Sequence, residues 1–242
     1  MKDEILNDSL SVTVFETPAA VAEAAAEAIA EVIRFKESTG ARTALMLAGG
    51  STPRATYERL AGKDVPWHKV DFFFGDERAV PPDDKDSNYR MAREVLFDPI
   101  GVRSAQIMRM LGDAPDLEKA ALEYEARLPE KISVLLLGMG EDGHTASLFP
   151  GSTALAERSR KVVRIVGPKP PPIRLTITPP VIEQAELCLV LVTGAAKREA
   201  LTRVAGKSSN LSETPILCAK NGLFLVDRAA DPRGETSSKR GT

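Results

Sequence analysis

The sequence is poor in the residues on which metal sites and disulfide frameworks depend. It contains only two cysteines and two histidines among 242 residues. Cys188 and Cys218 each lie inside an apolar stretch, without metal-ligand or redox spacing, so both are expected to be small buried hydrophobic residues. His68 and His144 are far from each other and from the cysteines in the sequence, which excludes the usual zinc patterns. We therefore expect no metal.

A strong charge of one sign is also lacking, as are long hydrophobic runs. The formal net charge is −2, so the chain has no broad basic face with which to neutralise a nucleic-acid backbone. No window approaches the ~20 apolar residues that span a bilayer, and the polar, acidic N-terminus has no signal-peptide pattern. We expect a cytoplasmic protein with neither a nucleic-acid nor a membrane partner.

Apolar segments alternate with helical patterns along the chain, and this alternation predicts an α/β fold. The apolar segments show no polar alternation, so helices are expected on both faces of the sheet. Thr17-Pro18 predicts the start of a long helix, and Gly40 its left-handed end. The expected strands are 11–15, 43–48, 70–74, 132–137, 162–166, 173–177, 187–193 and 223–226. The expected helices are 18–38, 87–97, 116–128, 179–185 and 195–205.

The length and the hydrophobic content of 43% are sufficient for one large core. We expect a single domain over residues 1–228, followed by a polar, disordered tail over residues 229–242. The segment Gly167–Pro172 is rich in proline and is interpreted as a stiffened loop inside the domain.

Four polar or glycine-rich clusters each follow directly on an expected strand. They are Gly49–Pro53, Gly75–Arg78, Gly138–His144 and Gly194–Lys197. Ligands of open parallel sheets bind beyond the carboxyl ends of the strands. The four clusters are therefore expected to meet at one edge of the sheet and to form one site.

Two of these clusters are candidate anion sites. The backbone amides of Gly49 and Gly50 and the hydroxyls of Ser51 and Thr52 can converge on a phosphate at a helix N-terminus. A tight turn with a serine or threonine cap explains the same residues about equally well. Lys197 lies in an expected first helical turn, where a cation is disfavoured unless an anion binds there. Taken alone, a solvated surface lysine remains the simpler interpretation of Lys197.

Asp76 and Arg78 follow a strand and are two residues apart, so they can face the same way in an extended segment. A salt-bridged turn is the competing interpretation of this pair. His144 lies in a glycine-rich loop, where an imidazole can take a proton from water, and Asp142 is close enough in sequence to orient it. We favour a catalytic role for His144 and a structural one for His68.

The sequence resembles a known family, the 6-phosphogluconolactonases, which are relatives of the glucosamine-6-phosphate deaminases. The resemblance covers roughly Val14 to Val226. It rests on five segments in the family's order, namely Gly49–Pro53, Phe74–Arg78, Asp86–Arg90, Gly138–Pro150 and Val192–Lys197.

The resemblance implies a single Rossmann-like domain with a mainly parallel sheet and no cofactor. The implied substrate is a phosphorylated sugar lactone, 6-phospho-D-glucono-1,5-lactone, which water opens to 6-phosphogluconate in the oxidative pentose phosphate pathway. The protein itself is expected to be a monomer or a small homo-oligomer.

The resemblance also implies roles for individual residues. His144 is implied as the general base and Asp142 as the group that orients or tunes it. Arg78 and Lys197 are implied as positive charges for the phosphate or the developing oxyanion, and Arg174 as a residue lining the site.

The remaining implied roles concern the rest of the ligand. The Gly49–Thr52 segment would hold the phosphate, while Asp76 and Asn88 would contact sugar hydroxyls or position the guanidinium of Arg78.

Two alternatives remain open from the sequence. One is a glucosamine-6-phosphate deaminase/isomerase. Those enzymes tend to end the histidine segment with Asn-Glu-Pro, where this chain has Ser147-Leu148-Phe149-Pro150, and they carry a different tail after the aspartate of Gly75-Asp76-Glu77-Arg78. The other is a non-catalytic sugar-phosphate-binding effector module, which would not need to retain His144.

Overall fold

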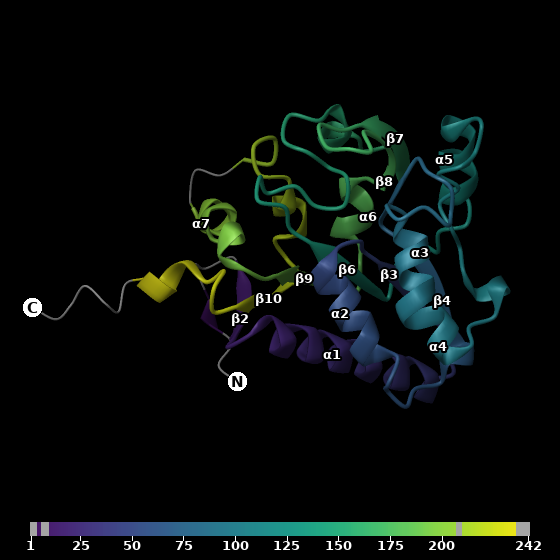
Figure 1. Cartoon of the computed structure of the whole chain (residues 1–242), viewed down its shortest axis with the longest axis horizontal. Coiled ribbons are helices and arrows are strands. Elements are labelled where there is room, and N and C mark those ends of the chain that lie inside the picture. The colour runs from purple at the N-terminus through teal and green to yellow at the C-terminus, as the bar shows by residue number, and fades with distance from the viewer. Residues whose placement is uncertain (1–3, 6–9, 207–209, 236–242) are drawn as a thin grey trace, which may run out of the picture.

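A mainly parallel sheet forms the centre of the computed structural model, which describes residues 4–5, 10–206 and 210–235 (Figure 1). Its strands are β1 (Glu4–Ile5), β2 (Ser11–Phe15), β3 (Thr43–Leu47), β4 (Val70–Phe74), β6 (Val134–Gly138), β9 (Leu187–Val192) and β10 (Leu223–Asp227). Their order is β1-β2-β10-β9-β6-β3-β4, and only β1 pairs antiparallel with its neighbour among these strands. The predicted α/β class and parallel sheet are confirmed.

A second sheet of three antiparallel strands lies beside the first. It contains β5 (Asp76–Arg78), β7 (Val162–Val166) and β8 (Ile173–Ile177), in the order β5-β8-β7. A single residue, Gly75, separates β4 from β5, and its backbone bonds both Leu47 and Ile177 at 2.9 Å. The sequence predicted β7 and β8 as strands but not the separate sheet that they form.

Four helices begin within one residue of their predicted starts, whereas the helix predicted from residue 195 begins with a 3₁₀ turn over Ala195–Lys197 and becomes α-helical at Arg198. The helices are α1 (Pro18–Ser38), α2 (Ser51–Leu60), α3 (Asn88–Ala92), α4 (Asp98–Ile100), α5 (Leu117–Glu125), α6 (Pro179–Glu183) and α7 (Arg198–Ala205). Thr17 caps α1 by accepting from the Ala20 amide at 3.2 Å, and Ser87 caps α3 by accepting from Arg90 at 3.1 Å. Gly40 follows α1 with a φ of +78°, the left-handed conformation that its position predicted.

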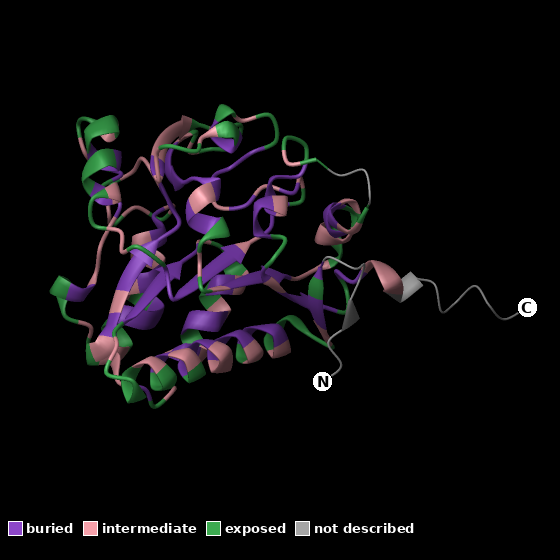
Figure 2. Ribbon diagram, turned by 180° about the vertical axis from the view of Figure 1, so that it is seen from behind, coloured by how far each residue is buried: buried purple, intermediate pink, exposed green. Residues whose placement is uncertain are grey.

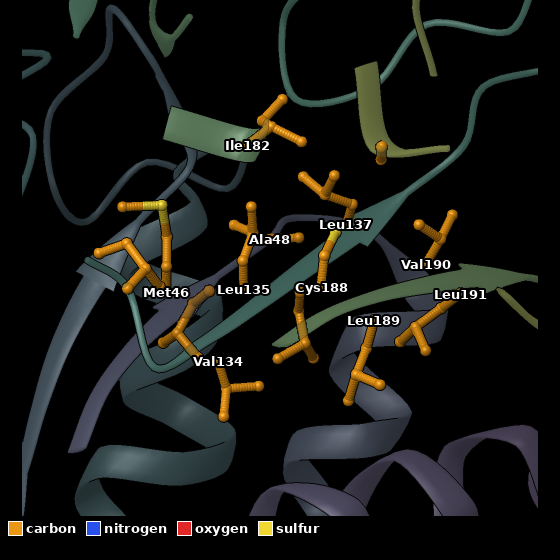
Figure 3. Packing of buried hydrophobic residues seen from close by; sticks show 14 of the residues in the cluster. Met46, Ala48, Val134, Leu135, Leu137, Ile182, Cys188, Leu189, Val190 and Leu191 are labelled. Atoms are coloured by element: carbon orange, nitrogen blue, oxygen red, sulfur yellow. The ribbon is translucent and has the colours of Figure 1, made fainter. Parts of the chain in front are cut away.

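The core lies on both faces of the central sheet. Helices α1 and α2 cover one face, and α6 with the small sheet lies toward the other (Figure 1). Residues Val134–Leu137 of β6 are at most 1% exposed, which explains their unbroken apolar sequence (Figure 3). Strands β3, β6 and β9 are buried over nearly their whole length, whereas α1 exposes its outer face (Figure 2).

The two cysteines are part of this core, as predicted. Cys188 and Cys218 are buried and form no disulfide with each other. Burial raises the pKa of each thiol to about 12, so neither is a reactive thiolate at neutral pH.

Two buried tyrosines hold the carboxyl ends of adjacent strands. The hydroxyl of Tyr57 accepts from the backbone amide of Ala48 at 2.8 Å and donates to its carbonyl at 2.9 Å. The hydroxyl of Tyr124 does the same at Phe74, at 2.7 and 3.0 Å. These bonds fix the backbone where β3 and β4 lead into the first two glycine clusters.

The predicted boundary at residue 228 falls just after β10. Beyond it, Ala230 and Asp231 are still buried, and Pro232–Glu235 forms a 3₁₀ turn, so the packed chain continues past the predicted end of the domain. Residues 236–242 of the predicted tail lie outside the described residues. Within the described residues, every helix is too short or too polar to cross a bilayer.

Candidate active site

A cavity of about 240 Å³ lies at the carboxyl ends of β3, β4, β6 and β9. All four glycine or polar clusters contribute to its wall, so they meet at one edge of the sheet, as their positions predicted. Its polar and charged lining residues are Ser51, Thr52, Asp76, Arg78, His144, Arg174, Thr193 and Lys197. The size suits a small ligand, since sites for larger molecules exceed roughly 300 Å³.

His144 lies at the wall of this cavity, and Asp142 fixes its orientation. Its Nδ1 makes a short hydrogen bond with Asp142 Oδ1, and its backbone amide donates to the same oxygen at 3.3 Å. A carboxylate on Nδ1 fixes the tautomer with the proton on Nδ1 and the lone pair on Nε2. Nε2 has no hydrogen-bond partner among the described residues and is left for the ligand.

The surroundings of His144 keep the ring neutral. Burial lowers the pKa of His144 below its usual value, Asp142 acts in the opposite direction, and the nearby charge of Lys169 lowers it further. Burial opposes the ionisation of Asp142, but its hydrogen bonds with His144 and Lys169 outweigh this and lower its pKa to about 2. At neutral pH the pair is therefore a carboxylate and a neutral imidazole.

The loop after β3 forms the anion-binding side of the cavity. Gly50 precedes α2 with a φ of +110° and has no side chain with which to cap the helix. The first amides of α2, which lie at the cavity wall, are therefore not bonded by a capping side chain. The hydroxyl of Thr52 lies 2.7 Å from that of Thr193, at the end of β9. Lys197 lines the same side, 3.7 Å from the exposed carboxylate of Glu141.

A buried network holds Asp76 at the cavity wall. Asp76 is 5% exposed and accepts from the Ser147 hydroxyl at 2.6 Å and from the Asn88 amide at 3.0 Å. The guanidinium of Arg174 lies 3.5 Å from the same Ser147 oxygen. Asp76 and Arg174 thus reach the cavity from neighbouring strands of the small sheet, linked through one hydroxyl.

Arg78 stands next to Arg174 across the two strands, because the register pairs these residues directly. Its Nη1 donates to the carbonyl of Asp86, while its buried Nε has no hydrogen-bond partner among the described residues. Glu77, between the two cavity residues, points away and accepts from the backbone amides of Asn88 and Tyr89 at 2.8 and 2.9 Å. Burial raises the pKa of Glu77, against these hydrogen bonds.

Two of the predicted site residues lie behind the cavity and not at its wall. Asp142 contacts His144, and Asn88 contacts Asp76 while packing against Gly49, where a Cβ would come within 2.1 Å of the Asn88 amide oxygen. Asn88 also lines an adjoining hollow that shares Arg78 with the main cavity. His68, predicted to be structural, is exposed at the start of β4, at the other end of the strand.

Sequence reasoning missed four residues that shape the site, namely Glu77, Ser147, Lys169 and Thr193. Ser147 belongs to the histidine segment, so its place in a family signature was a usable signal. The contact of Lys169 with Asp142 spans 27 residues and had no such signal.

The site therefore combines positive charge with one neutral base. Arg78, Arg174 and Lys197 line the cavity, against Asp76 as the one carboxylate among the lining residues. Burial lowers the pKa of Arg174, and the charge of Asp76 opposes this. Among the described residues, no group of three or more histidine, cysteine or acidic side chains is placed to hold a metal.

An uncapped helix start, three cations and an oriented imidazole at the edge of a parallel sheet define an α/β enzyme for a small anionic substrate. The chain belongs to the glucosamine-6-phosphate isomerase/6-phosphogluconolactonase family, whose model matches residues 16–224.

Curated relatives and solved structures agree with this assignment. The 6-phosphogluconolactonase of Synechocystis is 40% identical over 71% of this chain and 75% of its own length. That of Mycobacterium leprae is 35% identical over 92% of this chain and 97% of its own. The crystal structure of 6-phosphogluconolactonase from Leishmania guyanensis superposes with a TM-score of 0.80, at 30% identity, and covers 93% of this chain and 97% of that one.

Proposed function

We propose that this protein hydrolyses 6-phospho-D-glucono-1,5-lactone to 6-phospho-D-gluconate, with His144 as the general base. The observation that carries the proposal is the oriented imidazole. Asp142 occupies Nδ1, so the free lone pair of Nε2 belongs to a ring that lines the same cavity as three cationic side chains. A base and an anion site within one small cavity suit a phosphorylated substrate that reacts with water.

The phosphate binds on the side formed by the loop after β3. The amides at the start of α2, the hydroxyls of Ser51 and Thr52, and the ammonium of Lys197 surround that side of the cavity. The phosphate then acts as a handle that fixes the lactone carbonyl relative to His144.

The arginines supply the remaining positive charge. Arg78 and Arg174 both line the cavity, so their guanidinium groups can hold an anionic oxygen of the substrate. Asp76 accepts hydrogen bonds from sugar hydroxyls with the lone pairs that Ser147 and Asn88 leave free.

The reaction needs one base and no covalent intermediate. His144 Nε2 takes a proton from water while the water oxygen attacks the C1 carbonyl carbon, and the carbonyl oxygen becomes an oxyanion stabilised by the cations. The intermediate collapses by breaking the bond between C1 and the ring oxygen, and the protonated His144 returns its proton to that oxygen. The product acid then loses its own proton to solvent.

The alternative deaminase reaction is less well served by this site. Where the deaminases tend to place a glutamate after the histidine, this chain has Phe149, whose ring lies 4.7 Å from that of His144. Phe149 offers no carboxylate to move protons on an amino sugar.

The test is an assay on freshly prepared 6-phosphogluconolactone, with a dehydrogenase that consumes 6-phosphogluconate and a correction for spontaneous hydrolysis. We expect enzyme-dependent product formation and no ammonia from glucosamine 6-phosphate. Ammonia release without lactone hydrolysis would establish the deaminase, and tight binding of both sugars without turnover would establish an effector module.

We also propose a cytoplasmic location, and a monomer or small homo-oligomer as the assembly. Light scattering on the purified protein measures the assembly directly, and fractionation of the producing cell measures the location.

A further inference from the structure

Lys169 reaches the catalytic pair from a distant segment of the chain. Its Nζ lies 3.2 Å from Asp142 Oδ2 and 3.4 Å from His144 Nδ1. The lysine belongs to the proline-rich segment Gly167–Pro172 between β7 and β8, whereas Asp142 and His144 follow β6. Lys169 is not among the residues that line the cavity.

The backbone of Lys169 is fixed although its side chain is 46% exposed. The guanidinium of Arg174 donates to the carbonyls of Lys169, Pro170 and Pro171 at 3.3, 3.4 and 3.0 Å. The amide of Gly167 closes the loop by donating to Pro172 at 2.7 Å. These hydrogen bonds hold the backbone of the segment in the position from which Lys169 reaches Asp142.

The two contacts of Lys169 differ in kind. Nδ1 of His144 already donates its proton to Asp142 Oδ1, so it cannot accept from an ammonium. The hydrogen bond of Lys169 is therefore to Asp142 Oδ2, and its effect on His144 comes through its charge. Asp142 thus receives two donors from His144 on Oδ1 and one from Lys169 on Oδ2.

The charged groups that face His144 fall into two sets. Asp142 and Asp76 favour the protonated ring, while Lys169 disfavours it together with burial, which is the largest of these effects. Arg174 is not among the largest influences on His144; its guanidinium lies over the ring of Phe149, 5.6 Å from the ring centroid, and that ring in turn lies 4.7 Å from the imidazole.

We propose that Lys169 is a positioning residue for the pair formed by Asp142 and His144. Lys169 fixes the Asp142 carboxylate through Oδ2, and its positive charge opposes protonation of His144. The inference rests on the proposed function insofar as His144 acts as the base. The ion pair between Lys169 and Asp142 is half-exposed, and such ion pairs contribute little to the stability of a fold. We therefore expect Lys169 to act mainly on Asp142 and His144.

The test compares Lys169→Met, which removes the charge but keeps the length, with Lys220→Met at an exposed lysine that does not line the cavity. The ring signals of the two histidines are titrated by NMR, with His68 as the internal reference assigned through His68→Gln. We expect the pKa of His144 to rise in Lys169→Met, to return in Lys169→Arg, and to stay unchanged in Lys220→Met.

The same variants are assayed for kcat/KM against pH. In Lys169→Met the acidic limb should move to higher pH, so that activity near pH 6 falls relative to activity near pH 8. An unchanged His144 titration overturns the proposal, as does a raised KM without a shift of the pH profile, which would make Lys169 a substrate contact. Because the titration needs no turnover, a wild-type protein without lactonase activity would refute the proposed function while leaving the Lys169 result readable.

Discussion

Gly140 and His144 are in such close contact that no other residue fits at the glycine. The amide of Gly140 donates to the carbonyl of His144 at 2.8 Å, and a Cβ on Gly140 would lie 2.0 Å from the His144 Nδ1. The same Cβ would come within 2.5 Å of Asp142 Oδ1. The missing side chain is what allows the carboxylate and the imidazole to meet in this loop.

Substitution Gly140→Ala should therefore displace the imidazole. A misplacement of about 1 Å costs on the order of 100-fold in rate, so we expect a fall of about that size in kcat. The measurement is the lactonase assay together with the melting temperature. Gly62→Ala is the matched control, because its Cβ would meet only the Arg59 carbonyl at an ordinary 3.5 Å; an unaffected kcat in Gly140→Ala would contradict the geometry.

Substitution His144→Ala should remove the base but leave the anion site. A general base contributes about 10²–10⁴-fold, so kcat should fall by that factor while the affinity for 6-phosphogluconate, measured by calorimetry, changes little. His68→Ala is the control and should retain full activity. A parallel loss of binding and turnover would indicate that His144 is structural.

Substitution Asp142→Asn should change both the rate and its pH dependence. Asp142 raises the pKa of His144, so its removal lowers that pKa further and moves the acidic limb of kcat/KM to lower pH. The rate itself should fall about 10- to 100-fold, because an amide no longer fixes the imidazole tautomer. A limb that moved to higher pH would show that the carboxylate does not support the protonated ring.

Substitution Lys197→Met tests the phosphate side. The loss of one charge-assisted hydrogen bond, worth about 1.5–3 kcal/mol, should raise KM roughly 10- to 100-fold with a smaller change in kcat. Initial rates over a range of lactone concentrations separate the two parameters. If kcat fell while KM stayed constant, Lys197 would serve the oxyanion and not the phosphate.

Substitution Tyr57→Phe should destabilise the fold at the site. It leaves the amide and carbonyl of Ala48 buried without their partner, at a cost of about 1–3 kcal/mol in the free energy of unfolding. Urea denaturation measures this cost. Tyr89→Phe is the control, since Tyr89 makes its contacts with Phe74 and Arg109 through the ring, and its hydroxyl has no hydrogen bond to any described residue. Equal effects of the two substitutions would refute the assignment.

The sequence patterns were sufficient for the parallel sheet and for the edge at which the site lies. Periodicity and capping residues are local signals, which can be read from the sequence alone. Thr17 and Ser87 are examples, since each caps the helix that it predicted. Strand β5 could not be predicted in the same way, because three polar residues have no periodicity and the pairing partner Arg174 lies 96 residues from Arg78.

The site was predictable to the extent that its residues follow strands directly. Ser147, buried at 0% exposure, bridges Asp76 and Arg174 only after two sheets have come together. Lys169 is similar, since its contact with Asp142 depends on how Arg174 folds the proline segment. Such contacts arise from tertiary packing and leave no mark in local composition.

The small antiparallel sheet carries Asp76, Arg78 and Arg174, whereas His144 belongs to a loop of the central sheet. The side chains proposed for the sugar hydroxyls and the oxyanion thus lie on a different sheet from the phosphate loop and the base, and Gly75 joins the two sheets. A substitution on the small sheet can therefore change the contacts to the sugar ring while the phosphate loop and His144 keep their places on the central sheet.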